Sequence, residues 1–472
     1  MEPQQGAFDD AIESTGDPVK SNIDIRRSLV VTEQPILARF SFQRVLDQLV
    51  AQSGVPGMTS LQLFRQWWDT QNPAPGLGGS HHCDSEVDGD GNPVLNTYPY
   101  GCRPAVTQEE GIEAASNPFI SNDPGEYIPI GLFNRFDLAP ANGAHCGEHR
   151  IVYARRSGIT NSSSRNLIIL EANLPNPVPE IGLLGCLPAV KFWADLTKQS
   201  NIEKRAVALD DFYFKGLANF PPVIHVNHFG NNAAGVGQIR TNQFLQTAVT
   251  PRVWLLREFK LVRTCNGGNC TALEMVPATV KGNPFGPLFS PAGTHPQTAA
   301  FQQDFITQVA RLSANTLAGI DMKTPDVFNS GQSIENASTE NNYVAQFGTD
   351  PSAFRTAIQG ALTTLGSSLT PDEIVGRAEA LSCAGCHRLS ANPNTPGVPP
   401  IGGGLVWPSS LGFTHITETA TEVAGGVTRF VISPALLNSF LPKRKQVVDD
   451  FLNDKPPVVI DPTDPIGGRR TH

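Results

Sequence analysis

The most informative stretch of this sequence is LSCAGCH, residues 381–387. Two residues separate its two cysteines, and a histidine follows the second cysteine directly. This C-x-x-C-H spacing is the signature of covalent haem attachment, because two thiols so placed can bond to the two vinyl groups of one porphyrin. The adjacent histidine can then coordinate the iron as the proximal ligand. The motif therefore predicts one covalent haem c, bound by Cys383, Cys386 and His387.

The same spacing also occurs in redox dithiols and in halves of zinc sites, and it can arise by chance. A zinc site needs a second ligand pair of similar spacing, and none follows Cys386. A thioredoxin-like dithiol does not need His387 and belongs in a strand–helix unit, which the flanking sequence does not predict. The spacer residues Ala384 and Gly385 are small and would leave a porphyrin room close to the backbone. The haem interpretation is therefore favoured.

The sequence on both sides of the motif predicts helices. Residues 370–373, TPDE, form a capping box with proline at the first helical position, which predicts a helix that runs into Cys383. Pro442 opens a second predicted helix, whose apolar side chains extend through Phe451 and which ends before the two prolines at 456–457. With this motif and its capped helix, the region from 351 to 456 resembles the c-type cytochromes.

The resemblance implies a small all-α, cytochrome c-like domain in which the first and last helices cross beside the haem. Gly376 and Phe451 would meet at that crossing. It also implies that the loop PPIGGGLVWP, residues 399–408, covers the haem, with Leu405 and Trp407 shielding the ring from water. A plain surface loop is the alternative, although exposed Leu-Val-Trp side chains would be costly there.

The sixth iron ligand departs from the commonest cytochrome pattern, which uses a methionine downstream of the motif. Every methionine of this chain lies upstream: Met1, Met58, Met275 and Met322. The downstream histidines are His415 and the terminal His472. Because His415 lies in the apolar stretch GFTHI, it is the predicted distal ligand. The alternatives are a hydrogen-bonded core histidine beside an open iron site, and a ligand from the upstream chain.

The composition is that of an ordinary globular chain, with 472 residues, 40% of them hydrophobic, and a net charge of −9. Such a length suits about two or three domains. The negative charge argues against nucleic acid and anionic membrane surfaces as partners. No apolar run is long enough to span a bilayer, so we expect no transmembrane segment.

Six further cysteines lie outside the motif: Cys83, Cys102, Cys146, Cys186, Cys265 and Cys270. An even remainder in a chain that carries haem c predicts three disulfides and an oxidising compartment, periplasmic or extracellular. Cys265 and Cys270 bracket the turn NGGN and are expected to pair. The pairs Cys83–Cys102 and Cys146–Cys186 are the simplest completion, but sequence alone does not fix connectivity. The N-terminal residues MEPQQ have no signal regions, so we expect a mature form or a trimmed signal.

The chain before residue 351 predicts a mixed α/β or β-rich body stapled by disulfides. Strand-like runs occur at 150–156, 166–174 and 253–262, and a helix is expected to begin at the N-cap Thr59. The predicted units are a flexible acidic lead-in (1–27), the body (28–350), the cytochrome c-like haem domain (351–456) and a flexible tail (457–472).

Weaker metal signals lie in the body. Residues 84–92, DSEVDGDGN, alternate carboxylates like a calcium loop but lack its closing glutamate, so we expect a solvated acidic turn, with calcium as the alternative. A second metal site would need histidine pairs to converge in space. The candidate pairs are His81–His82, His145–His149 and His225–His228. The polar candidates Asp137, Glu148 and Arg150 fit buried ion pairs equally well.

Three functions fit these features. The first is a secreted or periplasmic monohaem cytochrome that transfers electrons, with a large body that binds or tethers a redox protein partner. The second is a haem enzyme, an oxidase, peroxidase or oxygenase, with an open distal site for a small-molecule substrate. The third is a structural or assembly-forming haem protein. The oligomeric state is not predicted.

Overall fold

The structure is a computed structural model that describes residues 23–77, 80–103, 113–161, 164–245, 253–335, 340–391 and 401–453. Three expected features therefore fall outside the described residues: the lead-in as far as residue 22, the start of the Gly/Pro loop at 399–400, and the tail 457–472.

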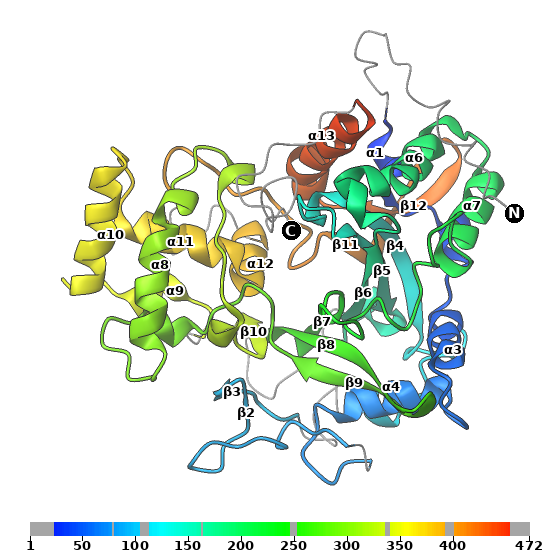
Figure 1. The fold of residues 1–472 in the computed structure, drawn as a ribbon, viewed down its shortest axis with the longest axis horizontal. Helices are drawn as coiled ribbons and strands as arrows, with labels where there is room; N and C mark the ends of the chain where they lie inside the picture. The colour runs from blue at the N-terminus through cyan, green and yellow to red at the C-terminus, as the bar shows by residue number, and fades with distance from the viewer. Residues whose placement is uncertain are drawn as a thin grey trace, which may run out of the picture.

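An antiparallel sheet of eight strands forms the centre of the molecule (Figure 1). The strand order is β1-β4-β5-β6-β7-β8-β10, and β9 pairs with β8 outside this path. The strands are β1 (Val30–Val31), β4 (Tyr127–Arg135), β5 (His145–Arg155), β6 (Asn166–Pro175), β7 (Gln238–Leu245), β8 (Val253–Asn266), β9 (Asn269–Ala278) and β10 (Gln332–Glu335). The three predicted strands correspond to β5, β6 and β8, so the β-rich body is confirmed.

The central strands are covered on both faces. On one face of β5, the Tyr153 hydroxyl donates a hydrogen bond to the Phe40 carbonyl oxygen (2.9 Å), within the largest hydrophobic core. On the other face, Glu148, Arg150 and Val152 line a cavity. Because successive side chains of a strand alternate between faces, one strand serves the core and the cavity together.

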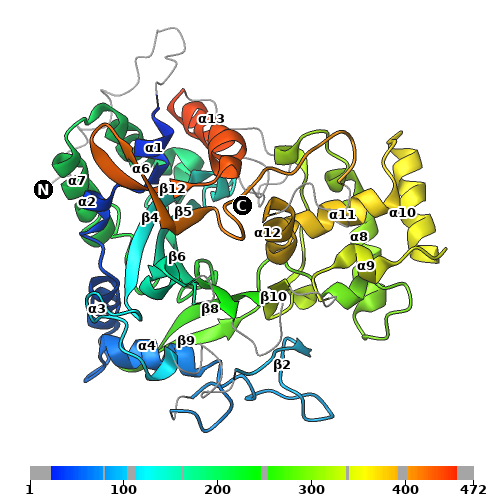
Figure 2. The ribbon, with the colours of Figure 1, turned by 180° about the vertical axis from the view of Figure 1, so that it is seen from behind.

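Helices of the N-terminal half pack around the core face of this sheet (Figures 1 and 2). They are α1 (Ile25–Ser28), α2 (Gln34–Leu37), α3 (Phe42–Ser53), α4 (Ser60–Asp69), α6 (Leu187–Asp195) and α7 (Ile202–Phe214). The predicted N-cap is confirmed, since Thr59 and Gln62 form a capping box at the start of α4. Leu63, Phe64 and Trp68 of this helix are buried, whereas Leu61 is only partly buried.

The other end of the molecule is a helical region with a hydrophobic core of its own, far from α3 and α7 in both views (Figures 1 and 2). Its helices are α8 (Thr298–Leu312), α9 (Tyr343–Phe347), α10 (Ala353–Thr364), α11 (Pro371–Leu381) and α12 (Cys383–Ala391). The predicted capping box of Thr370 and Glu373 starts α11. The helix predicted to run into Cys383 corresponds to α11, which ends at Leu381. Ser382 is extended, and α12 begins at Cys383 as a separate helix.

The segment 351–456 differs from the expected all-α domain in two respects. It contains a β-hairpin, β11 (Ile416–Ala424) and β12 (Val427–Ile432), which together with the last helix, α13 (Leu441–Leu452), joins the core of the sheet body. The expected crossing is not formed either: α11 packs on α8, α9, α10 and α12, whereas α13 packs on α1 and α6. Phe451 contacts Phe136 instead, because the apolar face of α13 packs against the sheet body.

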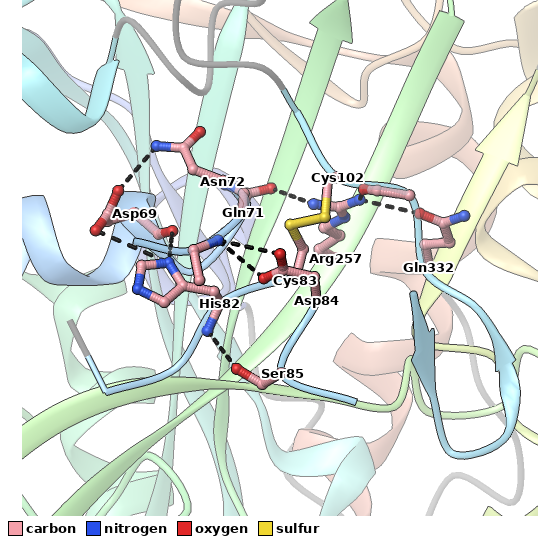
Figure 3. Close-up of a disulfide and its surroundings, with 12 residues drawn as sticks. Asp69, Gln71, Asn72, His82, Cys83, Asp84, Ser85, Cys102, Arg257 and Gln332 are labelled. Carbon is pink, nitrogen blue, oxygen red and sulfur yellow. Dashed lines mark hydrogen bonds and ion pairs between the residues drawn. A yellow bond between two sulfur atoms is a disulfide. The ribbon is translucent and has the colours of Figure 1, made fainter. Parts of the chain in front are cut away.

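Three disulfides staple the body, with the pairing that the spacing suggested: Cys83–Cys102, Cys146–Cys186 and Cys265–Cys270. Cys83–Cys102 closes the loop between α4 and β4, which carries the small hairpin β2 (Val94–Leu95) and β3 (Tyr98–Pro99). Figure 3 shows the buried Arg257 guanidinium beside this disulfide, where it donates to Gln71 (3.0 Å) and Gln332 (3.1 Å). The long loop is thereby fixed to β8 and β10.

Candidate functional site

A cavity of about 160 Å³ lies where the sheet body meets α12 and α13. Strands β4 to β8 supply one wall, and the motif helix α12, the start of β11 and α13 supply the rest. Cys383, His387 and His415 all line this cavity, although His415 lies 28 residues beyond His387 in the chain. The structure therefore brings together three of the residues singled out from the sequence.

The motif forms the first turns of α12. Cys383 and His387 are four positions apart and share the face toward the cavity. The amide of Ala384 donates to the Ser333 hydroxyl of β10 (2.9 Å), which ties this helix to the sheet. A β-carbon at Gly385 would lie 1.9 Å from the Glu379 carbonyl oxygen, so this glycine is needed for the close approach of α11. The sequence suggested a different reason for a small residue here, namely room for a porphyrin ring close to the backbone.

Cys386 is directed away from the cavity. It lies in a small core with Leu389, Ile401 and Trp407, and burial raises the pKa of its thiol to about 12. Trp407 donates from Nε1 to the Ser390 hydroxyl (3.0 Å), and Leu405 packs at the edge of the same core. Neither Leu405 nor Trp407 lines the cavity. Both residues close the space behind the second cysteine.

His387 is held in one orientation by its neighbours. Its Nδ1 lies 2.6 Å from the Phe413 carbonyl oxygen, and its ring packs on Trp254 with centroids 4.5 Å apart. A carbonyl oxygen only accepts, so Nδ1 carries the hydrogen and Nε2 keeps its lone pair. Burial lowers the pKa of His387 to about 4. The imidazole is therefore neutral, the form that ligates metals.

His415 faces the same cavity, with its ring centroid 5.5 Å from that of His387. Its Nδ1 bonds the Ser433 hydroxyl (3.0 Å), and burial lowers its pKa to about 3. The Nε2 atom is buried and has no hydrogen-bond partner among the described residues. A histidine oriented through Nδ1, with Nε2 left over, is the usual arrangement of a metal ligand.

The segment that carries His415 is anchored to the body by a buried ion pair. Arg165, just before β6, bonds both carboxylate oxygens of Glu418 (2.7 and 2.8 Å). It also approaches the Thr414 hydroxyl (3.3 Å). Behind the histidine, the Ser433 amide donates to the His415 carbonyl oxygen (2.8 Å). These contacts fix His415 opposite His387.

The sheet wall of the cavity is strongly charged. Arg150 bonds Glu148 (2.6 Å) and Glu171 (3.0 Å), and Arg240 bonds Glu258 (2.7 Å). Ion pairs therefore account for Glu148 and Arg150, as the sequence allowed, and both residues also line the cavity. The charged lining residues that the sequence did not single out are Arg135, Glu171, Arg240, Lys281 and Arg444. The sequence signal that could have identified these lining residues is the alternation of charged and apolar side chains along a strand.

Among the described residues, the candidate histidine pairs do not form a group of three or more possible ligands for one ion. Within the described residues, the one group of three ligand types close together is Cys83, Asp84 and Cys102, whose cysteines form a disulfide. His149 has its own surroundings, since its Nδ1 accepts from Trp193 Nε1 (3.2 Å). The rings of His225 and His228 pack against each other at 4.9 Å. His228 nevertheless lies near enough to His149 to contribute to its lowered pKa, after the effect of burial.

The acidic stretch 84–92 folds as a turn that uses its own carboxylates. Asp88 accepts hydrogen bonds from the backbone amides of Asn92 and Asp90, each with a donor–acceptor distance of 2.9 Å. These bonds contribute to the lowered pKa of Asp88. Asp84 accepts from the Ala74 amide (2.9 Å). This is the geometry of an acidic surface turn.

Comparison with protein-family models, with curated proteins and with solved structures gives no match. No helix in the described part of the chain is long and apolar enough to cross a membrane.

Proposed function

We propose that this protein is a monohaem c-type electron-transfer protein of the periplasm or the extracellular space. The observation that carries the proposal is the meeting of Cys383, His387 and His415 in one cavity, with both imidazoles oriented through Nδ1. The unpartnered Nε2 of His415 fits an iron ligand, because a buried nitrogen without a partner is costly unless something binds it. The three disulfides agree with an oxidising compartment.

Each residue has a distinct role in this proposal. Cys383 and Cys386 would carry the thioether bonds, His387 the proximal bond and His415 the distal bond to iron. When bound, the haem supplies the one-electron Fe(III)/Fe(II) couple. The Phe413 carbonyl and the Ser433 hydroxyl hold the two imidazoles in place. Cys386 lies outside the cavity lining, so its thioether bond would need the small core around its thiol to open toward the cavity.

The likeness to c-type cytochromes is then limited to the motif and its capped helix. The sheet body, whose size an electron carrier alone does not explain, supplies the wall opposite α12. Leu405 and Trp407 would exclude water behind Cys386 and not over the ring. In this proposal the haem would lie between the sheet body and the helical region. The resemblance to c-type cytochromes does not imply that position.

A haem enzyme is the second candidate, and the charged wall favours it. Arginine, lysine and carboxylate side chains of the cavity could bind a polar substrate beside the iron. Iron coordination separates the two functions. Six-coordinate, low-spin iron supports electron transfer, and five-coordinate iron that binds small ligands supports catalysis.

The proposal is tested by expressing the full chain in a host that attaches haem c. Pigment should stay on the protein after acid–acetone extraction and be lost in the Cys383→Ser/Cys386→Ser variant. The spectrum should be low-spin, and His415→Ala should make it high-spin and open to carbon monoxide. His225→Ala, outside the cavity, is the matched control. Pigment that extracts freely from wild type would end the haem proposal, while high-spin wild-type iron would favour the enzyme.

A further inference from the structure

One side chain of the cavity wall has no role in the proposed function. Asn242 of β7 lines the cavity and is only 4% exposed. Its Oδ1 atom is buried and has no hydrogen-bond partner among the described residues. Among the uncharged polar residues of the described lining, His415 is the other one with such an atom, and the proposed function assigns its Nε2 to iron. The carboxamide of Asn242 is left without a partner and without a role.

The sheet register explains why the wall itself offers Asn242 no partner. Asn242 lies directly opposite Leu167 of β6 and Leu256 of β8, and both leucines line the cavity. Residues directly opposite each other share one face of a sheet, so the carboxamide stands between two aliphatic side chains. Two positions earlier on β7, the Arg240 guanidinium is already engaged by the Glu258 carboxylate (2.7 Å).

The haem of the proposed function does not satisfy this oxygen either. An amide oxygen accepts hydrogen bonds and therefore needs an N–H or O–H donor. The edge of haem c carries methyl groups, thioethers and propionates, and an ionised propionate only accepts. Both axial positions of the iron are assigned to His387 and His415. The donor must therefore come from another molecule.

Water is the simplest donor, but the surroundings of Asn242 do not favour it. A buried water molecule usually makes about three hydrogen bonds, and the neighbouring leucines can make none. An organic molecule with one donor group and an apolar body would match both the carboxamide and the leucines. Ligand pockets typically have this composition, with a few polar groups that orient an otherwise apolar ligand.

We propose that Asn242 binds the N–H or O–H group of a small neutral organic molecule, whose apolar body lies against Leu167 and Leu256. Primary amides and alcohols have this chemistry. The donor end is neutral, because a charged group placed between two leucines would be costly to bury. The site is separate from the iron ligands, so it does not depend on the proposed function.

Two probes of nearly equal shape test the proposal. Hexanamide and methyl pentyl ketone share a carbonyl group and a pentyl chain, but the amide has an NH₂ group where the ketone has a methyl group. Isothermal titration of the full-chain protein should show one bound hexanamide, with the ketone bound about tenfold or more weakly. Asn242→Leu removes the acceptor at nearly equal volume, so it should reverse this preference.

Stability separates a binding role from a structural one. Asn242→Leu removes a buried polar group that has no partner, so without a probe it should unfold at an equal or higher urea concentration than wild type. The matched control is Asn341→Leu, outside the described cavity lining. The Asn341 carboxamide is equally buried, but it bonds Asn283 Oδ1 (3.0 Å) and the Ile334 amide (2.8 Å). This control should lose stability.

Either of two results overturns the proposal. If wild type does not bind hexanamide, or binds both probes equally, water is the partner of Asn242. If Asn242→Leu loses as much stability as Asn341→Leu, the carboxamide has a structural role. The titrations measure binding and not the haem spectrum, so they also decide the question for protein that carries no haem.

Discussion

The two sides of α12 have different surroundings: a cavity with a charged wall on one side and a small apolar core on the other. Residues of one motif face each side. Cys383 and His387 face a cavity whose far wall carries arginines and glutamates. Cys386, three residues after Cys383, lies in a core of Leu389, Ile401 and Trp407. A short motif therefore defines which groups are present, while the packing around the helix decides how each group can react.

The largest expected effect is on thiol reactivity. In protein made without haem attachment, Cys386 should react with iodoacetamide at pH 8 about a thousandfold more slowly than an ordinary thiol, because its pKa of about 12 leaves little thiolate. Cys383, on the cavity wall, should be modified first. The measurement is mass spectrometry of timed digests, with denatured protein as the control. Equal rates for the two cysteines would show that the two sides of α12 do not differ.

Trp407→Ala should destabilise the closed side by about 4 kcal/mol, because it leaves a large void beside Cys386 and removes the bond to Ser390. Val406→Ala is the matched control, since Val406 is 70% exposed and should change stability by less than about 0.5 kcal/mol. Urea unfolding of both variants measures the difference. A loss near that of the control would mean that Trp407 does not hold this core together.

On the cavity side, Arg165→Met should cost about 3 kcal/mol, because it leaves the buried Glu418 carboxylate without its partner. The segment with His415 should loosen, so a haem-loaded sample should gain high-spin iron. The double variant Arg165→Met/Glu418→Gln should recover part of the stability, since no uncompensated charge remains. Urea unfolding and the visible spectrum are the measurements. A fully low-spin Arg165→Met protein would exclude a positioning role.

The smallest effect concerns His149, a buried histidine on the core face of β5 that does not line the cavity. Burial lowers its pKa to about 3, so the unfolded chain binds a proton near pH 6.5 while the folded chain does not. Its contribution to stability is present above pH 6.5 and falls by about 2 kcal/mol between pH 7 and pH 5. Thermal unfolding of His149→Phe should show a pH dependence weaker by that amount. An unchanged dependence would assign the acid sensitivity to other groups.

Much of the local structure could be predicted from the sequence. The capping boxes at Thr59 and Thr370 depend on residues three apart, and both are formed. The strand periodicity of β5, β6 and β8 depends on neighbouring residues in the same way. The disulfide Cys265–Cys270 closes a hairpin tip, where few other partners are within reach. Such features need little information from distant parts of the chain.

The packing of α13 was harder to predict, because it depends on which core the helix joins. The sequence of an amphipathic helix such as α13 shows which of its faces is apolar. It does not show which part of the protein will pack against that face. The sequence allowed Phe451 to pack near Gly376, and the body offered Phe136 instead.

The sequence by itself determined the chemistry that is available: two cysteines and a histidine at fixed spacing, six further cysteines, and the strands and caps around them. Only the tertiary structure decided that His415 lies opposite His387, that Cys383 faces the cavity while Cys386 does not, and that arginines from β4, β5 and α13 line the same cavity. The reason is physical. Spacing and periodicity act over a few residues, whereas burial, ion pairing and the lowered pKa values also depend on contacts between distant segments, such as that of Arg165 with Glu418.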